Sequence, residues 1–89
     1  MAKIKEGYVL RRVAGQPVVI AVGKASEKFH GMIKLNESAC CIWKGTEAGL
    51  TPEETALRLV QEFDIDISTA RMDTQKMMEK MKELEILED

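Results

Sequence analysis

Hydrophobic residues follow a strand-like pattern in the first third of the chain and a helix-like spacing in the remainder. Two early runs, residues 8–13 and 17–22, are rich in β-branched residues and predict strands. Residues 14–16 separate them, and Gly15 can supply the positive φ that a tight turn needs. The two runs therefore predict a β-hairpin, in which Pro17 is tolerated because it begins the second strand.

A third short apolar strand, over residues 32–35, follows a polar loop and runs directly into a helix. Asn36 takes the N-cap position, where its side-chain oxygen can accept a backbone N–H of the first turn. The helix is predicted over residues 36–47, and one face of it carries Ala39, Ile42 and Trp43. A strand this short is typical of a sheet edge, and an unpaired edge can bind an extended peptide.

Two more helices are predicted beyond residue 50. Thr51 and Glu54 form a capping box, and Pro52 fills the first helical position. The apolar stripe of this helix is Ala56, Leu57, Val60 and Phe63. Asp66 or Ser68 caps the last helix, whose apolar set is Ala70, Thr74, Met77, Met78, Met81 and Leu84. Ile86 and Leu87 are expected to fold the tail back onto the core.

The order of elements predicts an α+β fold, a three-stranded antiparallel sheet followed by three helices. It is winged helix-turn-helix-like, with the wing placed before the helices. A hydrophobic fraction of 45% supports a core, and 89 residues suit a single domain over residues 1–89. The sequence has no signal peptide and no apolar run long enough for a bilayer, so we expect a cytoplasmic protein with no membrane partner.

Charge is divided unevenly along the chain. Residues 1–35 have a net charge of +5 and residues 36–89 a net charge of −7. Two interpretations stay open: complementarity between sheet and helices, or a basic sheet edge that receives an acidic partner. Residues 64–89 hold four basic against eight acidic residues, which a DNA duplex would repel. We therefore expect no nucleic-acid partner.

The sequence offers little for catalysis. No glycine-rich phosphate loop follows a strand, and nothing near His30 in its loop would orient that side chain. Cys40 and Cys41 are helical neighbours that point in different directions, and no further ligand has metal spacing. We interpret them as small buried thiols. The prediction is a protein that is not an enzyme, with no cofactor and no metal.

The last helix carries two sets of side chains on a helical wheel. Ala70, Thr74, Met78 and Met81 centre on the core direction. The second set, centred about 80–90° away at ~100° per residue, is half apolar and half charged. It consists of Asp73, Met77, Lys80 and Leu84. Such a border strip suits the wall of a groove, and methionine adapts to varied partners.

Five segments of the chain resemble the PqqD-like family, small peptide-binding domains named for pyrroloquinoline quinone (PQQ) biosynthesis. They are Gly31-Met-Ile-Lys-Leu-Asn-Glu-Ser-Ala, Ile42-Trp43, Thr51-Pro-Glu-Glu, Ala70-Arg-Met-Asp and Leu84-Glu-Ile-Leu. The strand–helix junction is the most specific of them, and the resemblance extends from Tyr8 almost to the end. The same domain is the RiPP recognition element of many pathways that modify ribosomally made peptides.

The resemblance implies a peptide chaperone rather than an enzyme. The domain would bind the leader of a precursor peptide as a strand added to residues 32–35, in a cleft closed by the last helix. It would then present that peptide to a modifying enzyme, commonly a radical S-adenosylmethionine (radical SAM) protein. The peptide-binding residues so implied are Met32, Ile33, Lys34 and Leu35 on the strand and Asp73, Met77 and Lys80 on the helix.

Two other functions stay open at this stage. The predicted fold is also that of a small winged-helix DNA-binding regulator, although the acidic helices oppose it. Alternatively, the third strand could pair with a second copy of the chain. We expect a monomer, with a strand-mediated dimer forming at high concentration.

Overall fold

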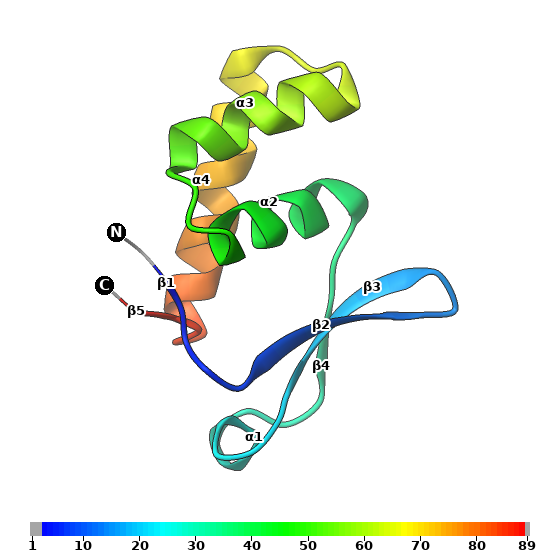
Figure 1. Ribbon diagram of the computed structural model, residues 1–89, viewed down its shortest axis with the longest axis vertical. Helices are drawn as coiled ribbons and strands as arrows, with labels where there is room; N and C mark the ends of the chain where they lie inside the picture. The colour runs from blue at the N-terminus through cyan, green and yellow to red at the C-terminus, as the bar shows by residue number, and fades with distance from the viewer. Residues whose placement is uncertain (1–2, 89) are drawn as a thin grey trace.

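The computed structural model describes residues 3–88, and Figure 1 shows three helices on one side of a small sheet. Its elements are β1 (Lys3–Ile4), β2 (Tyr8–Val13), β3 (Gln16–Ala21), α1 (Ala25–Lys28), β4 (Met32–Lys34), α2 (Glu37–Glu47), α3 (Pro52–Phe63), α4 (Ile67–Glu83) and β5 (Leu87–Glu88). The predicted α+β, winged helix-turn-helix-like arrangement of three antiparallel strands followed by three helices is confirmed.

The main sheet has the order β2-β3-β4, with both pairs antiparallel and β3 in the middle. The hairpin turn is two residues long rather than three, because Gln16 already pairs with Val13. Both turn residues have positive φ, 52° at Ala14 and 82° at Gly15. This pair of angles is typical of the turns whose twist matches the flanking strands. β4 is the short edge strand that the sequence predicts, although it ends at Lys34.

Local hydrogen bonds fix the start of each long helix. The Ala39 N–H donates to Asn36 Oδ1 at 2.8 Å. The Glu54 N–H donates to the Thr51 hydroxyl at 3.1 Å, and the Thr51 N–H donates back to Glu54 Oε1 at 2.8 Å. At α4 the cap is Asp66, not Ser68, since its carboxylate accepts from the Thr69 N–H. These bonds satisfy N–H groups that the helices leave without internal partners.

Two features were absent from the predicted element order. A four-residue helix, α1, interrupts the predicted polar loop, and it is too short to carry a periodic pattern. β1 and β5 pair antiparallel, with Ile4 opposite Leu87. Strands of two residues give no alternation, and their partners stand at opposite ends of the sequence. The predicted return of the tail is confirmed, because Ile86 is fully buried.

Side chains form two connected clusters. One lies between the sheet and α2 and α4 and contains Val19, Leu35, Trp43, Met81 and Ile86. The other joins the three long helices and contains Cys41, Ile42, Ala56, Leu59 and Ala70. The prediction of Leu57 in the core was wrong, since that side chain is 50% exposed and Leu59 is buried instead. The buried stripe of α3 is rotated toward Thr55 and Leu59 because α2 and α4 both pack on that side.

Candidate functional site

The outer edge of β4 presents unpaired backbone groups in a defined register. The Leu35 N–H donates to the Pro17 carbonyl at 2.9 Å, so Leu35 directs its backbone N–H toward β3. Backbone groups alternate between the two sides of an antiparallel strand, so Ile33 also faces β3. The N–H and C=O groups of Met32 and Lys34 therefore point away from the sheet. They are the groups that an added strand could bind.

The C-terminal end of β4 has an additional anchor. Pro17 has no N–H to donate to the Leu35 carbonyl opposite it. The side-chain amide of Gln16 takes that place and donates to the Leu35 carbonyl at 2.6 Å. The backbone at the strand–helix junction is therefore fixed on its inner side.

The inner side chains of β4 meet α4 across an apolar hollow. Ile33 is partly buried and Leu35 is 5% exposed, and both pack in the cluster between sheet and helices. The hollow is small and lies mostly over packed apolar atoms. It is lined by Val19, Ile33, Leu35, Trp43, Met77, Lys80, Met81, Leu84 and Ile86. The strip of α4 that the sequence predicts as a groove wall supplies Met77, Lys80 and Leu84.

A second hollow of about 260 Å³ continues past the start of α2. It is lined by Asn36, Ser38, Ala39, Ile42, Asp73, Lys76, Met77 and Lys80. Met77 and Lys80 line both hollows, so the two adjoin. We refer to them together as the groove between β4, the first turns of α2, and α4. Met77 packs against both core clusters while remaining partly exposed, so its side chain forms the floor of the groove.

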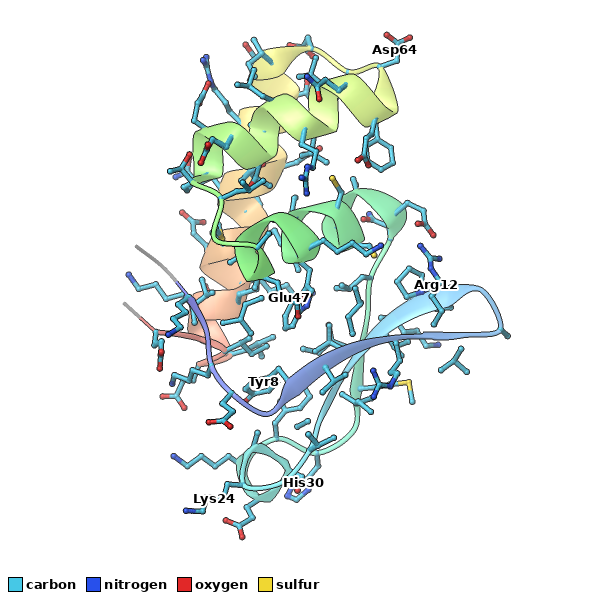
Figure 2. All side chains as sticks on the ribbon, in the orientation of Figure 1. Tyr8, Arg12, Lys24, His30, Glu47 and Asp64 are labelled. Atoms are coloured by element: carbon cyan, nitrogen blue, oxygen red, sulfur yellow. The ribbon has the colours of Figure 1, made fainter. Side chains whose placement is uncertain are left out.

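One ion pair holds the hairpin against the start of α2. Arg12 Nη1 and Nη2 donate to the two carboxylate oxygens of Glu37 at 3.1 and 2.8 Å, and Figure 2 shows Arg12 reaching from the hairpin toward that helix. The hydrogen bonds from Arg12 keep the pKa of Glu37 below its ordinary value. The pair also joins the basic half of the chain to the acidic half. It supports the prediction of complementarity between sheet and helices.

The structure brings five of the seven predicted site residues together. Ile33 and Leu35 share one hollow with Met77 and Lys80, and Asp73 joins those two helical residues in the other. The side chains of Met32 and Lys34 alternate to the opposite face of the sheet, so only their backbone groups reach the edge. The sequence did not predict the contribution of α2. The sequence assigned Asn36 to a helix cap and Ala39 to a core face. Their position directly after the edge strand was the feature that could have indicated a place in the groove.

The cysteines take no part in this groove. Cys40 and Cys41 are free thiols, 3% and 6% exposed, as the sequence predicts. Burial, and then the nearby Glu62 carboxylate, raise the pKa of Cys41 to about 11, so its thiol stays protonated at neutral pH. Within residues 3–88 no three potential ligands gather as a metal site. In the same range, no helix has the length and apolar character needed to cross a membrane.

A larger hollow of about 410 Å³ lies elsewhere, between the segment 3–8 and the end of α2. It is lined by the segment before β2 and by the end of α2, and it borders neither β4 nor α4. Figure 2 places His30 and Lys24 beside α1, at the end of the molecule away from the long helices. The groove beside β4 combines the outward backbone groups of a main-sheet edge with apolar side chains.

Comparison with family models identifies a family that covers most of the chain. The model of the family described as "Coenzyme PQQ synthesis protein D (PqqD)" matches residues 18–87, which include β4, the groove and all three long helices. Comparison with the sequences of curated proteins gives no match.

Two solved structures share the fold. TbiB1 in complex with the TbiA(beta) leader peptide aligns with a TM-score of 0.76 and 22% identity, over 97% of this chain and 94% of that chain. Lasso peptide synthetase B1 complexed with the leader peptide aligns with a TM-score of 0.78 and 16% identity, over 99% and 98%. At these identities the similarity establishes the architecture, and the function depends on the site.

Proposed function

The chain belongs to the PqqD family, and we propose that it binds the leader of a ribosomally made precursor peptide as a strand added to β4. The observation that carries this proposal is the open edge of β4 beside the α4 groove. Two backbone positions, Met32 and Lys34, point outward there. The two structural neighbours were each solved with a leader peptide, which agrees with this assignment.

Each proposed binding residue has a role that follows from its position. The backbone groups of Met32 and Lys34 pair with the leader, while Ile33 and Leu35 form the apolar wall beneath it. Met77 forms the floor that receives an apolar leader side chain. Asp73 and Lys80 border the groove with opposite charges and bind polar groups of the peptide. Backbone pairing supplies affinity, and the pockets for alternate side chains supply selectivity.

The domain then acts as an accessory protein rather than an enzyme. It holds the leader and presents the rest of the precursor to a modifying enzyme, for which a radical SAM protein is our candidate. Neither the binding step nor the presentation step requires a cofactor in this chain. We place the process in the cytoplasm, where precursor peptides are made.

The winged-helix shape also suggests DNA binding as a function, but the negative charge of the helices opposes it. α3 offers Arg58 against Glu53, Glu54 and Glu62. Of the basic residues on α4, Arg71 is already paired with Glu53 at 2.7 Å. A duplex would meet mostly carboxylates on both helices. Salt-sensitive micromolar binding to duplex DNA in an anisotropy assay would favour the regulator over the peptide chaperone.

The test of leader binding uses two methionines of the same helix. Met77→Asp puts a charge on the groove floor and is expected to weaken leader binding by about ten- to a hundredfold. Met72→Asp is the matched control, because Met72 is 56% exposed and lies outside the groove. The measurement is fluorescence anisotropy with the labelled leader of a candidate precursor peptide, chosen by a search of the genes near this one.

Folding must be followed in the same samples. Met77 packs against both clusters, so Met77→Asp is expected to lower the melting temperature somewhat as well. Binding is therefore compared well below both transitions. If Met77→Asp binds the leader as tightly as the parent protein does, the groove assignment is wrong. Failure of the parent protein to bind would reject leader recognition itself.

A further inference from the structure

The face of the main sheet opposite the helices is left uncovered by residues 3–88 (Figure 1). Leu10, Val19 and Ile33 form a cross-strand row that packs toward the helices. Side chains of neighbouring rows point the other way. The outer face therefore carries Val9, Ile20 and Met32 in one row, Arg11, Val18 and Lys34 in the next, and Val13 near the turn. Val18, in the middle strand, is only 1% exposed between its neighbours, and Val9 and Ile20 are partly buried.

This outer face is unusually apolar for a surface. Val13 is 54% exposed and Met32 is 53% exposed, and Val22 at the end of β3 is 43% exposed. Only two other large hydrophobic side chains of the described chain are exposed, Leu57 and Met72, and both lie on helices. Val13 and Val22 lie at opposite ends of the hairpin, and the partly buried Val9 and Ile20 and the exposed Met32 lie between them on the same face. A continuous apolar face of this kind marks an interaction surface.

The charges on this face have one sign. The residues of β2, β3 and β4 include no Asp or Glu. Arg12 is paired with Glu37 on the helical side, whereas the guanidinium of Arg11 contacts only the neighbouring Leu10 carbonyl, at 3.4 Å. Arg11 and Lys34 are thus available to a partner. The complementary surface is apolar in the centre and carries carboxylates around it.

A second copy of this chain does not satisfy that requirement. A twofold contact between two outer faces would place Arg11 and Lys34 against the same cations of the other copy. Like charges held opposite one another destabilise a contact. A head-to-tail contact would place the outer face of one copy against the acidic helices of the next. Unless the copies closed into a ring, such a contact would build an open chain of subunits. The partner is therefore a different protein.

The outer face is continuous with the proposed leader edge. Met32 and Lys34 offer backbone groups to the leader and side chains to the outer face. A leader strand paired with β4 would extend the sheet, and every second leader side chain would lie on the same face. A protein docked there would touch the sheet and the leader together.

We propose that this outer face is the docking surface for the modifying enzyme, through an apolar patch of that enzyme bordered by carboxylates. The proposal rests on leader binding at β4. It assigns the two sides of the domain to two partners. The groove side holds the apolar residues of the leader, and the outer side recruits the enzyme to the loaded domain.

The experiment compares enzyme binding by a double variant and a control variant. Arg11→Glu combined with Val13→Glu reverses the charge and disrupts the exposed apolar patch. Leu57→Glu is the control, because Leu57 is 50% exposed on α3. Each purified domain is titrated with a purified candidate modifying enzyme, a radical SAM protein chosen by a search of the genes near this one, and separately with the labelled leader. Circular dichroism confirms that the variants are folded.

We expect the double variant to lose at least about tenfold in affinity for the enzyme. Its affinity for the leader should stay within about twofold of the parent value, since neither residue borders the groove. Unchanged enzyme binding by the double variant, or an equal loss in Leu57→Glu, would overturn the docking proposal. Leader binding is read independently, so a parent domain that fails to bind the leader rejects the proposed function instead.

A second measurement tests whether the leader contributes to the docking surface. Saturating leader should tighten enzyme binding, and saturating enzyme should tighten leader binding by the same factor. The double variant should lose this coupling. Equal enzyme affinity with and without leader would contradict a surface shared by the leader and the sheet.

Discussion

The two edges of the main sheet differ in length and in what protects them. β2 pairs with β3 over six residues, whereas β4 pairs over three. The Val22 N–H donates to the Gly7 carbonyl at 2.7 Å, so the backbone groups of Gly7 face β3. Because backbone groups alternate between the two sides of a strand, those of Leu10 and Arg12 on β2 point away from the sheet. There the Leu10 carbonyl accepts from the Arg11 side chain at 3.4 Å. No side chain of residues 3–88 takes such a place on β4.

The surroundings of the two edges differ as well. Arginines at two successive positions flank the β2 edge, and charge is a common way to discourage strand pairing. The β4 edge lies beside an apolar groove. The comparison suggests that the long edge is protected and the short edge is kept open. An edge of three residues also limits unwanted pairing, because few backbone bonds can form without help from the groove.

The largest expected difference between the two edges comes from removing one outward N–H from each in turn. Lys34→Pro removes an N–H that the leader needs and places a ring where the peptide would lie. We expect leader binding to weaken by about ten- to a hundredfold. Arg12→Pro removes an outward N–H on β2 and should leave leader binding within about twofold. Anisotropy with the labelled leader measures both.

Lys34→Ala separates the backbone from the side chain in this experiment. It keeps the N–H, so it should bind the leader much more tightly than Lys34→Pro does. Equal losses in the alanine and proline variants would show that the Lys34 cation, not strand pairing, carries the affinity. A large loss in Arg12→Pro would place the peptide on the wrong edge.

A smaller effect is expected from loosening the inner side of β4. Gln16→Ala leaves the Leu35 carbonyl without its donor and should lower the free energy of unfolding by about 1 kcal/mol. Amide exchange at Leu35 should become faster, while exchange at Val22, on the β2 side, should stay close to the parent rate. Hydrogen-exchange NMR resolves the two sites. Equal acceleration at both would indicate a general loss of stability.

The smallest effect concerns the ion pair that holds the hairpin. The pKa of Glu37 is lowered by its hydrogen bonds from Arg12, so this stabilisation is complete above the ordinary glutamate pKa of 4.5. It is lost as the pH falls through the lower folded value. Arg12→Gln should therefore unfold at slightly less urea than the parent at neutral pH. Both partners are about half exposed, so the difference is small.

The measurement for this pair is urea unfolding at about pH 7 and about pH 3. The two proteins should differ at the higher pH and become alike at the lower. A difference that persists in acid would show that Arg12 acts through packing of its aliphatic stem. Leader binding at neutral pH should change little, since neither Arg12 nor Glu37 lines the groove.

Sequence predicted the parts of the fold that depend on neighbouring residues. The caps at Asn36 and Thr51 are local hydrogen bonds, so the residue types alone located the helix starts. The hairpin followed from two β-branched runs, although its turn was predicted one residue too long. Alanine rarely takes positive φ, and nothing in the sequence marked Ala14 as such a residue.

Contacts between distant parts of the chain were harder to predict from the sequence. The pairing of β1 with β5 joins the two ends of the sequence without any local signal, and Leu57 matched a helical stripe that packing rotated away. Of the site, the helical wheel identified the α4 wall, because a border strip is a property of one helix. The contribution of α2 depends on how β4, α2 and α4 meet. Asn36 fitted the role of a helix cap and Ala39 that of a core residue, so neither residue type indicated a groove.

The pairing of β1 with β5 has a consequence for re-engineering the connectivity of this chain. Lys3 lies opposite Glu88, so the two ends of the described chain are adjacent in space. A short linker could join them, and new ends could be opened in the exposed segment beside α1. Such a circular permutant would keep β3, β4 and the long helices intact while moving the attachment point for a fused enzyme or reporter to the end of the molecule formed by α1 (Figure 1).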